Sequence, residues 1–362
     1  MNQSSSQRSL RSASRRDFLA IASGAALTLG ARRAAAQAKA GPPTSIDVHT
    51  HWEPLAYRKV LEELGPGAAG DANAMNWDLP KRIQWMDEHG VKTHVLTLSG
   101  RMPFQWVPPD AGATLAQIVN DAAIDAHKAY PDRFLAGVIV SPRDPQLALK
   151  ELNRVAGKPG MCALALPNSF EGKDYLFEPE YEPLLKRCEE LGYPLLFHPM
   201  DGDVNYYSMA RIGDSVSMKA NLVNTLGFPF EHATTAAKFI ITGTLDRHPR
   251  LEVVLPHAGG VFPYIAGRIE HDFAATKARG DLKLEHPFEY YLRRFHYDTL
   301  AYYPETLRFL IKKVGVDRVV IGTDNYAIMD VEYPNALVEQ LKLPAADLDL
   351  ILRGNAKRLL HV

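Results

Sequence analysis

Short apolar runs alternate with longer amphipathic segments from about residue 45 to the end of the chain. Eight of these runs are extended and resemble buried strands. They are residues 45–49, 92–99, 134–141, 161–167, 194–199, 251–257, 294–299 and 318–324. Helical patterns lie between them, for example over residues 115–130 and 182–192. Strand and helix in regular alternation predict a parallel sheet with helices packed on it.

The number of repeats selects one α/β architecture. Eight strand–helix pairs in roughly 320 residues are typical of a (β/α)8 TIM barrel, whereas a doubly wound sheet has fewer strands and a glycine-rich first turn. No G-x-G-x-x-G sequence comes directly after any of the strand-like runs. The long stretch between the fifth and sixth strands, residues 200–250, is expected to supply helices that wall the site. We expect residues 41–362 to form one domain.

The first forty residues differ in kind and are typical of an export signal. Arg15 and Arg16 precede an apolar stretch over residues 18–30, and a run of small residues ends at Ala38. The apolar stretch is too short to span a bilayer comfortably, so stable membrane insertion is not expected. Residues 1–40 are therefore interpreted as a twin-arginine signal peptide, which predicts a periplasmic or secreted protein. A disordered basic tail is the alternative.

Composition narrows the class of partner. The chain has 362 residues, 46% of them hydrophobic, and a formal net charge of −1. Its charges are balanced along the sequence, which argues against nucleic acid and favours a small-molecule substrate. The two cysteines, Cys162 and Cys188, form no C-x-x-C pair. A metal in this protein must therefore be bound by histidine and carboxylate.

Five polar residues fall at the carboxyl ends of predicted strands, which is the active-site rim of a barrel. His49 and His51 end the first strand, and their side chains point the same way because strand residues alternate faces. His198, His257 and Asp324 end the fifth, sixth and eighth strands. A single strand-end histidine is more often a capping or core residue. Four histidines and an aspartate on one rim indicate a metal-dependent active site.

Chemistry suggests how these five residues divide. Imidazoles and a carboxylate suit zinc, with manganese as the alternative, and leave a position open for water or substrate. We assign His49, His51, His198 and Asp324 as metal ligands. His257 is then an unligated acid or base, and Asp324 also takes part in catalysis. The fourth strand ends in "ALALPNS", with no lysine or glutamate positioned to bridge two ions, so one metal is expected.

Seven motifs carry a resemblance to a known family: "DVHTH", "WDLPKRIQWMDEHGV", "FHP", "LPHAGGVFPYIAGRI", "YDT", "IGTD" and "GNAKRLL". From about residue 45 to its end, the chain resembles the amidohydrolase superfamily, in its aminocarboxymuconate semialdehyde decarboxylase-like branch. The resemblance implies a mononuclear zinc barrel, usually a homodimer, that decarboxylates unsaturated or aromatic acids without an organic cofactor. The ligand and catalytic positions of that branch match the five residues assigned above.

The substrate-binding residues are less clear. The arginine that the branch places before its "WD" motif is missing here, and Met200 stands where a tryptophan is common. Arg101 and Arg143, each just past a strand end, are candidate replacements, because arginine binds carboxylates bidentately. Arg268 matches an arginine of the branch that reaches the neighbouring subunit's site. Asp298 ends the seventh strand and is expected to orient the substrate-binding loop or His257, unless it is a helix N-cap.

Two enzyme hypotheses follow. The first is a metal-dependent, non-oxidative decarboxylase of a small unsaturated or aromatic acid, which the resemblance favours. The second is a metal-dependent hydrolase of a lactone, amide or ester, which the missing arginine favours. A non-catalytic binding protein is a third class, but an unligated histidine beside a complete ligand set argues against it.

Overall fold

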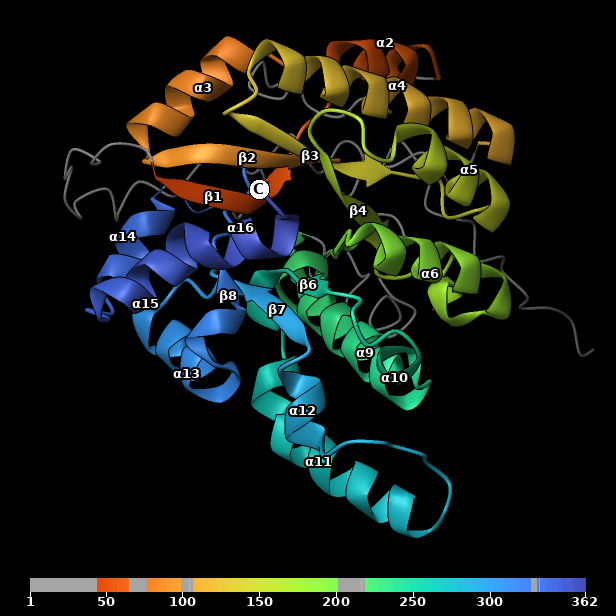
Figure 1. Ribbon diagram of the computed structural model, residues 1–362, viewed down its shortest axis with the longest axis vertical. Coiled ribbons are helices and arrows are strands. Elements are labelled where there is room, and N and C mark those ends of the chain that lie inside the picture. The colour runs from red at the N-terminus through yellow and green to blue at the C-terminus, as the bar shows by residue number, and fades with distance from the viewer. Residues whose placement is uncertain are drawn as a thin grey trace, which may run out of the picture. The chain divides into compact units, whose positions relative to one another are not determined.

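Eight parallel strands form the centre of the computed structural model, which describes residues 44–64, 77–98, 104, 107–200, 216, 219–326, 331 and 333–362. The strands pair in sequence order from β1 to β8 (Figure 1). Their bounds are β1 Ser45–His51, β2 Val91–Thr97, β3 Phe134–Ile139, β4 Met161–Pro167, β5 Leu195–His198, β6 Val253–Leu255, β7 Phe295–Asp298 and β8 Val319–Val320. The first and last strands meet through the bridges Asp47↔Ile321 and Thr50↔Asn325, which close the barrel. The predicted (β/α)8 fold is confirmed.

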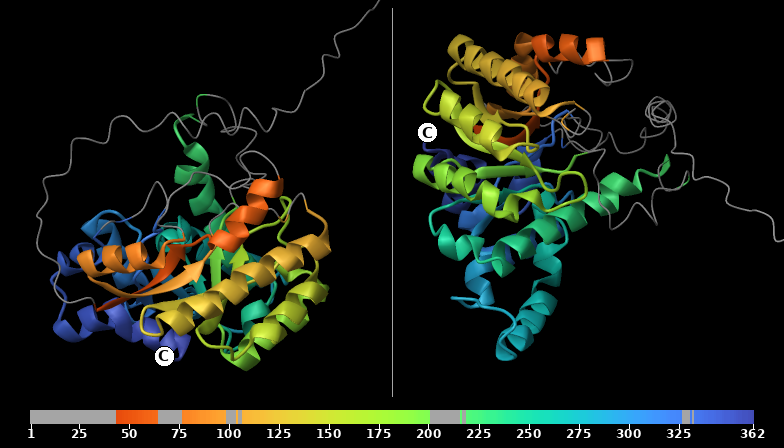
Figure 2. Two further views of the ribbon diagram at one scale, coloured as in Figure 1. Left: turned by 90° about the horizontal axis from the view of Figure 1, so that it is seen from above. Right: turned by 90° about the vertical axis from the view of Figure 1, so that its right-hand side faces the viewer.

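Helices surround the strands, as Figures 1 and 2 show. Their bounds are α2 Leu55–Leu64, α3 Leu79–Glu88, α4 Pro109–Ala129, α5 Pro145–Val155, α6 Glu182–Leu191, α9 Phe228–Ile241, α10 Thr244–Arg247, α11 Phe262–Ala278, α12 Phe288–Leu292, α13 Pro304–Val314, α14 Pro334–Glu339, α15 Ala345–Asp349 and α16 Asn355–Leu360. The helices α9 and α10 lie between β5 and β6, so the predicted helical insert is confirmed. No described helix is long and apolar enough to cross a membrane.

Local sequence explains where several helices begin and end. Asp78 caps α3 by accepting a hydrogen bond from the Lys81 backbone N–H at 3.0 Å. Asp144 caps α5 in the same way, and Pro145 occupies the first turn, where its missing N–H costs nothing. Gly192 ends α6 in the left-handed conformation that glycine adopts without strain.

The barrel interior and the helical layer have separate apolar cores. The interior set includes Ile46, Val48, Val95, Val254 and Val320, one or two side chains from each of several strands, and α16 packs against it. The larger set lies between the strands and the surrounding helices. Close-packed interiors of this kind keep the strands, and thus the residues at their carboxyl ends, in fixed positions.

Two of the observed strands, the sixth and the eighth, stop before the site residues at the ends of their predicted apolar runs. The sixth ends at Leu255 and the eighth at Val320, whereas the patterns extend to residues 257 and 324. The reason is backbone conformation: His257, Ala258 and Asp324 have φ values of 53°, 55° and 59°. Side-chain-bearing residues rarely adopt this left-handed region, and it concentrates at functional sites. His257 and Asp324 are therefore carried on turns just beyond their strands.

Candidate metal centre and active site

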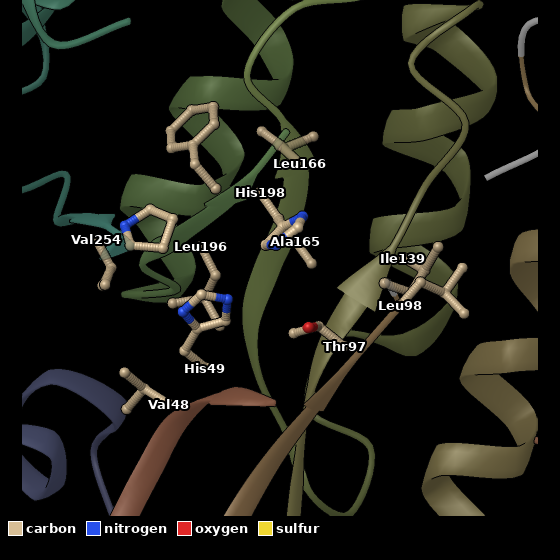
Figure 3. A pocket seen from close by; sticks show the side chains of 12 residues that line it. Val48, His49, Thr97, Leu98, Ile139, Ala165, Leu166, Leu196, His198 and Val254 are labelled. Atoms are coloured by element: carbon tan, nitrogen blue, oxygen red, sulfur yellow. The ribbon is translucent and has the colours of Figure 1, made fainter. Parts of the chain in front are cut away.

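Four predicted ligands converge at the carboxyl end of the barrel. His49 and His51 come from β1, His198 ends β5 and Asp324 follows β8; their ligand atoms all lie within 4.8 Å of one another. Asp324 Oδ1 is 2.7 Å from His51 Nε2, 3.3 Å from His49 Nε2 and 3.7 Å from His198 Nε2. Figure 3 shows His49 and His198 side by side at the wall of a pocket. The group thus has the size and composition of a metal site.

Each of these histidines is held through its other ring nitrogen. The Nδ1 partners are Asp298 Oδ2 at 2.7 Å for His49, the Leu98 carbonyl at 3.1 Å for His51 and the Pro199 carbonyl at 2.8 Å for His198. A carbonyl oxygen only accepts, so Nδ1 of His51 and His198 must carry the hydrogen. Nε2 of all three histidines lies toward Asp324 Oδ1 and is the atom that would bind a metal, an arrangement that metal-binding histidines commonly show.

The unpaired atoms of the site fit a divalent cation. Nε2 of His49 and of His198 is buried and has no hydrogen-bond partner among the described residues. Such atoms are rare in folded proteins unless something else satisfies them. Burial alone raises the pKa of Asp324, but the surrounding histidines outweigh it and hold the pKa well below its usual value, so Asp324 is a carboxylate. The residues present therefore fit a metal ion.

The charges around His49 and His198 also fit a metal ion between them. Burial lowers the pKa of His49, but the hydrogen bonds to Asp298 and Asp324 raise it to about 10. Burial and the neighbouring His51 lower the pKa of His198 to about 3. Two carboxylates thus favour a positive charge at His49, while His198 is a neutral imidazole. A divalent cation between them satisfies both preferences.

His257 lies beside the four ligands but outside their group. Its Nε2 is 3.6 Å from Asp324 Oδ2, whereas the three ligand histidines lie closest to Oδ1. Its ring centroid is 5.0 Å from that of His49. Its backbone N–H donates to Asp298 Oδ2 at 3.0 Å, which fixes the turn after β6. The structure thus brings all five predicted residues to one place.

The adjoining pocket has mostly apolar walls. His49 and His198 face side chains that include Val48, Leu98 and Ile139 (Figure 3). Neither arginine nor lysine is among the described residues that line it. Walls of this kind suit the hydrocarbon part of a small ligand, with His49 and His198 placed to contact its polar group.

A family model described as amidohydrolase matches residues 46–362. The chain belongs to the amidohydrolase family. It is 27% identical over 335 residues to a 2-amino-3-carboxymuconate-6-semialdehyde decarboxylase from Dictyostelium discoideum, covering 86% of this chain and 90% of the relative. It is 30% identical over 288 residues to a gamma-resorcylate decarboxylase from Rhizobium sp. (strain MTP-10005), covering 77% and 85%.

Solved structures share the amidohydrolase fold. A 2,6-dihydroxybenzoate decarboxylase complexed with 2,6-dihydroxybenzoate superposes with a TM-score of 0.74 at 25% identity, over 88% of this chain and 99% of the other. A 5-carboxyvanillate decarboxylase from Novosphingobium aromaticivorans, complexed with manganese, gives a TM-score of 0.76 at 22% identity, over 90% and 98%.

Asp298 of this amidohydrolase does not line the pocket, so the expectation that it binds substrate is not met. Its side chain is fully buried behind His49, where it contacts the backbone of His257, the residue that it was also expected to orient. Besides His49 Nδ1, it accepts hydrogen bonds from the backbone N–H groups of His257, Ala258 and Leu300, at 3.0, 2.7 and 3.0 Å. Burial alone raises its pKa, yet His49 outweighs this and lowers it, so Asp298 is ionised. The geometry makes Asp298 a support for His49 and His257.

The two candidate substrate-binding arginines that the structure describes, Arg143 and Arg268, are not brought to the pocket. Arg143 donates to the Phe104 carbonyl at 3.1 Å and lies 3.4 Å from Glu171, at the protein surface. Arg268 is exposed on α11. Arg101 falls outside the described residues. None of the three therefore lines the described part of the pocket.

A buried polar network that the sequence pattern did not predict lies beneath β1. Arg82 of α3 is fully buried, donates to the His51 carbonyl and to His94 Nδ1, and its guanidinium lies 4.8 Å from the centre of the Tyr326 ring. Nearby, Asp47 accepts a hydrogen bond from the His49 backbone N–H at 3.0 Å, and burial raises its pKa to about 7. These contacts fix the backbone that carries both ligands of β1.

A second acidic cluster in the described residues offers no comparable site. It consists of Asp246, Glu285 and His286, and the latter two are exposed. The Tyr291 hydroxyl already donates to Asp246 at 2.9 Å. Of the two candidate metal-binding clusters in the described part of the chain, only the one at the barrel rim has buried nitrogen atoms without a hydrogen-bond partner.

Proposed function

We propose that the protein is a metal-dependent, non-oxidative decarboxylase of a small aromatic or unsaturated carboxylic acid. The observation that carries the proposal is His257, held unligated 3.6 Å from Asp324 beside a complete ligand set, in a chain whose curated relatives are decarboxylases. The apolar walls of the pocket support a substrate with a hydrocarbon ring or chain.

The residues divide the work as follows. His49, His51, His198 and Asp324 would hold a divalent metal, which would act as a Lewis acid toward an oxygen of the substrate. His257 Nε2, near Asp324 Oδ2, delivers a proton to the carbon that bears the carboxylate. The bond between that carbon and the carboxylate then breaks, its electron pair restores the unsaturated system, and carbon dioxide leaves. The apolar walls exclude water from the reacting carbon.

The second candidate is a hydrolase of a lactone, amide or ester. It is favoured by one observation: no arginine lines the described part of the pocket to bind a substrate carboxylate. The test is a panel of hydroxybenzoates, carboxymuconates and lactones with the metal-loaded protein. We expect carbon dioxide release from one of the acids. Ring opening of a lactone without carbon dioxide release from any acid would overturn the decarboxylase proposal.

We propose zinc as the native ion, at one per chain. Three imidazoles and one carboxylate form a donor set that suits this ion. Manganese is the alternative, because solved relatives are described with bound manganese. Elemental analysis of protein expressed with both metals supplied separates the two. A content of two ions per chain would contradict the single-metal proposal.

We propose that the protein works as a homodimer, with Arg268 of α11 directed toward the partner subunit. Tyr264 of α11 and Phe309 of α13 are 47% and 41% exposed, and their rings stack with centroids 4.8 Å apart. Ile265 beside them is exposed as well. Exposed apolar side chains that gather on one face often mark an interface. Light scattering should give twice the monomer mass, and Tyr264→Glu should reduce it to the monomer mass.

We propose that residues 1–40 direct export by the twin-arginine route and that the mature protein begins near Lys39. Support comes from Arg15 and Arg16 before the apolar stretch and from the small residues that follow it. Replacing both arginines by lysine should retain the precursor in the cytoplasm, whereas unchanged export of this variant would contradict the proposal.

A further inference from the structure

Two histidines touch each other behind the pocket. His232 lies on α9, in the insert between β5 and β6, and its side chain is fully buried. Its Nε2 is 2.8 Å from Nδ1 of His257, with ring centroids 5.1 Å apart. One hydrogen lies between the two nitrogens, so one ring donates and the other accepts. The direction of this bond determines which nitrogen of His257 can exchange a proton.

We propose that His232 is a positioning residue that keeps the hydrogen of His257 on Nδ1, so that Nε2 alone exchanges a proton with the substrate. The proposal rests on the proposed function, because it concerns the same proton transfer. It adds a residue to that reaction that acts through His257 and does not contact the substrate.

The direction of the bond follows from what a proton carrier must do. When His257 takes up a proton on Nε2, both of its ring nitrogens are donors. Its partner must therefore accept. If Nε2 of His232 accepts in both states, His257 gains and loses its proton without any rearrangement of the buried pair. In the opposite arrangement, protonation of His257 would place two N–H groups against each other.

The surroundings of His232 fit the role of a permanent acceptor. Burial, followed by the neighbouring His257, lowers the pKa of His232 well below its ordinary value, so His232 itself stays neutral. Its Nδ1 has no hydrogen-bond partner among the described residues. An unpaired buried N–H destabilises the folded state, and a leucine or phenylalanine in the same space would avoid that cost. A histidine at position 232 is therefore explained by its contact with His257 through Nε2 and not by stability of the fold.

His257 is fixed from two directions as a result. Its backbone N–H donates to Asp298, and its ring is held by His232. Together these contacts aim Nε2 at the space beside Asp324 Oδ2, 3.6 Å away. Helix α9 thus positions the ring of the proton carrier as well as walling the site.

Kinetics of three variants test the proposal. In His232→Phe we expect kcat to fall by about tenfold or more, with KM and metal content within about twofold of wild type, as for outer-shell partners of an active site. His232→Gln should recover most of the activity, because its amide oxygen accepts from Nδ1. The matched control is Thr235→Val, which removes a buried hydrogen bond to Asn168 one turn further along α9 and should leave kcat unchanged. Equal losses in the Phe and Gln variants would overturn the proposal.

Nitrogen NMR of the histidine rings gives a second test that needs no turnover. In the zinc-loaded protein, the spectrum of His257 should show hydrogen on Nδ1, and His232→Phe should mix the two tautomers. If this pattern appears and no acid is decarboxylated, the assignment of His232 stands and the proposed function fails. Hydrogen on Nε2 of wild-type His257, or full kcat in His232→Phe, would overturn the proposal for His232.

Discussion

Replacing Asp298 by asparagine should weaken metal binding, although Asp298 is not a ligand. Its carboxylate accepts four hydrogen bonds, two at each oxygen: His49 and His257 at Oδ2, Ala258 and Leu300 at Oδ1. An amide has one oxygen, so its NH2 group must face two donors. If the amide oxygen takes the Oδ1 position, the NH2 group meets His49 Nδ1. His49 can then pair with it only by moving its hydrogen to Nε2, the atom that binds the metal.

The magnitude follows from the two lost bonds. Hydrogen bonds to a charged acceptor contribute about 1.5–3 kcal/mol each, so the substitution costs about 3–6 kcal/mol in total. Changes at an outer-shell partner typically weaken metal binding by about 10–100-fold. This corresponds to about 1.4–2.8 kcal/mol. We expect the metal dissociation constant of Asp298→Asn to rise by about 10–100-fold. The remainder of the lost hydrogen-bond energy should appear as a lower free energy of unfolding of the metal-free protein.

The assay is competition with a chelator for the metal, combined with urea unfolding of the metal-free protein. The matched control is Asp317→Asn, which also removes one carboxylate charge but at a surface pair with Arg293. Its metal affinity should equal that of wild type. Wild-type affinity in Asp298→Asn would refute the argument that Asp298 sets the tautomer of His49.

Three further predictions concern other histidines. His198→Ala should contain little metal in elemental analysis, because losing a ligand weakens metal binding by more than the roughly 10–100-fold expected at an outer-shell partner. Retention of one ion per chain would remove His198 from the ligand set. His257→Ala should keep its metal and its fold but lose about a hundredfold or more in kcat, and loss of metal instead would make His257 a ligand. Burial, then Arg82 and Arg133, depress the pKa of His94, so the folded protein keeps it neutral while the unfolded chain binds a proton below about pH 6.5. The free energy of unfolding should therefore decrease as pH falls through about 6.5. In urea titrations below that pH, His94→Gln should reduce the dependence of this free energy on pH by one proton, or about 1.4 kcal/mol per pH unit. Equal pH dependence in the variant and in wild type would contradict the depressed pKa.

The fold was predictable from the sequence because its signal is repeated eight times. Each buried strand of a parallel barrel is an apolar run, and each run lies within a few residues of an observed strand. The ligands were predictable for a related reason. Residues at the carboxyl ends of strands share one rim, so His49, His51, His198 and Asp324 could be grouped before any distance was known.

The supporting residues could not be found in this way. His232 occupies a core position of α9, where the pattern looks like that of any buried helix face, and its partner His257 belongs to another element 25 residues away. Arg82 belongs to an amphipathic helix in which arginine normally faces solvent. Asp298 was placed at the correct rim, but whether its side chain faces the pocket or the back of His49 depends on strand geometry that the sequence does not encode locally.

The closure of the barrel between β1 and β8 sets the order in which the metal centre can be assembled during synthesis. His51 and Asp324 are separated by 273 residues along the chain. At a translation rate of about 5–20 residues per second, the ribosome needs roughly 15–55 s to make the segment between them. Throughout that interval the two histidines of β1 lack their carboxylate partner. A nascent chain or a fragment that ends before Asp324 consequently has no complete ligand set, and a complete metal site reports that the chain has been made through β8 and that the barrel has closed.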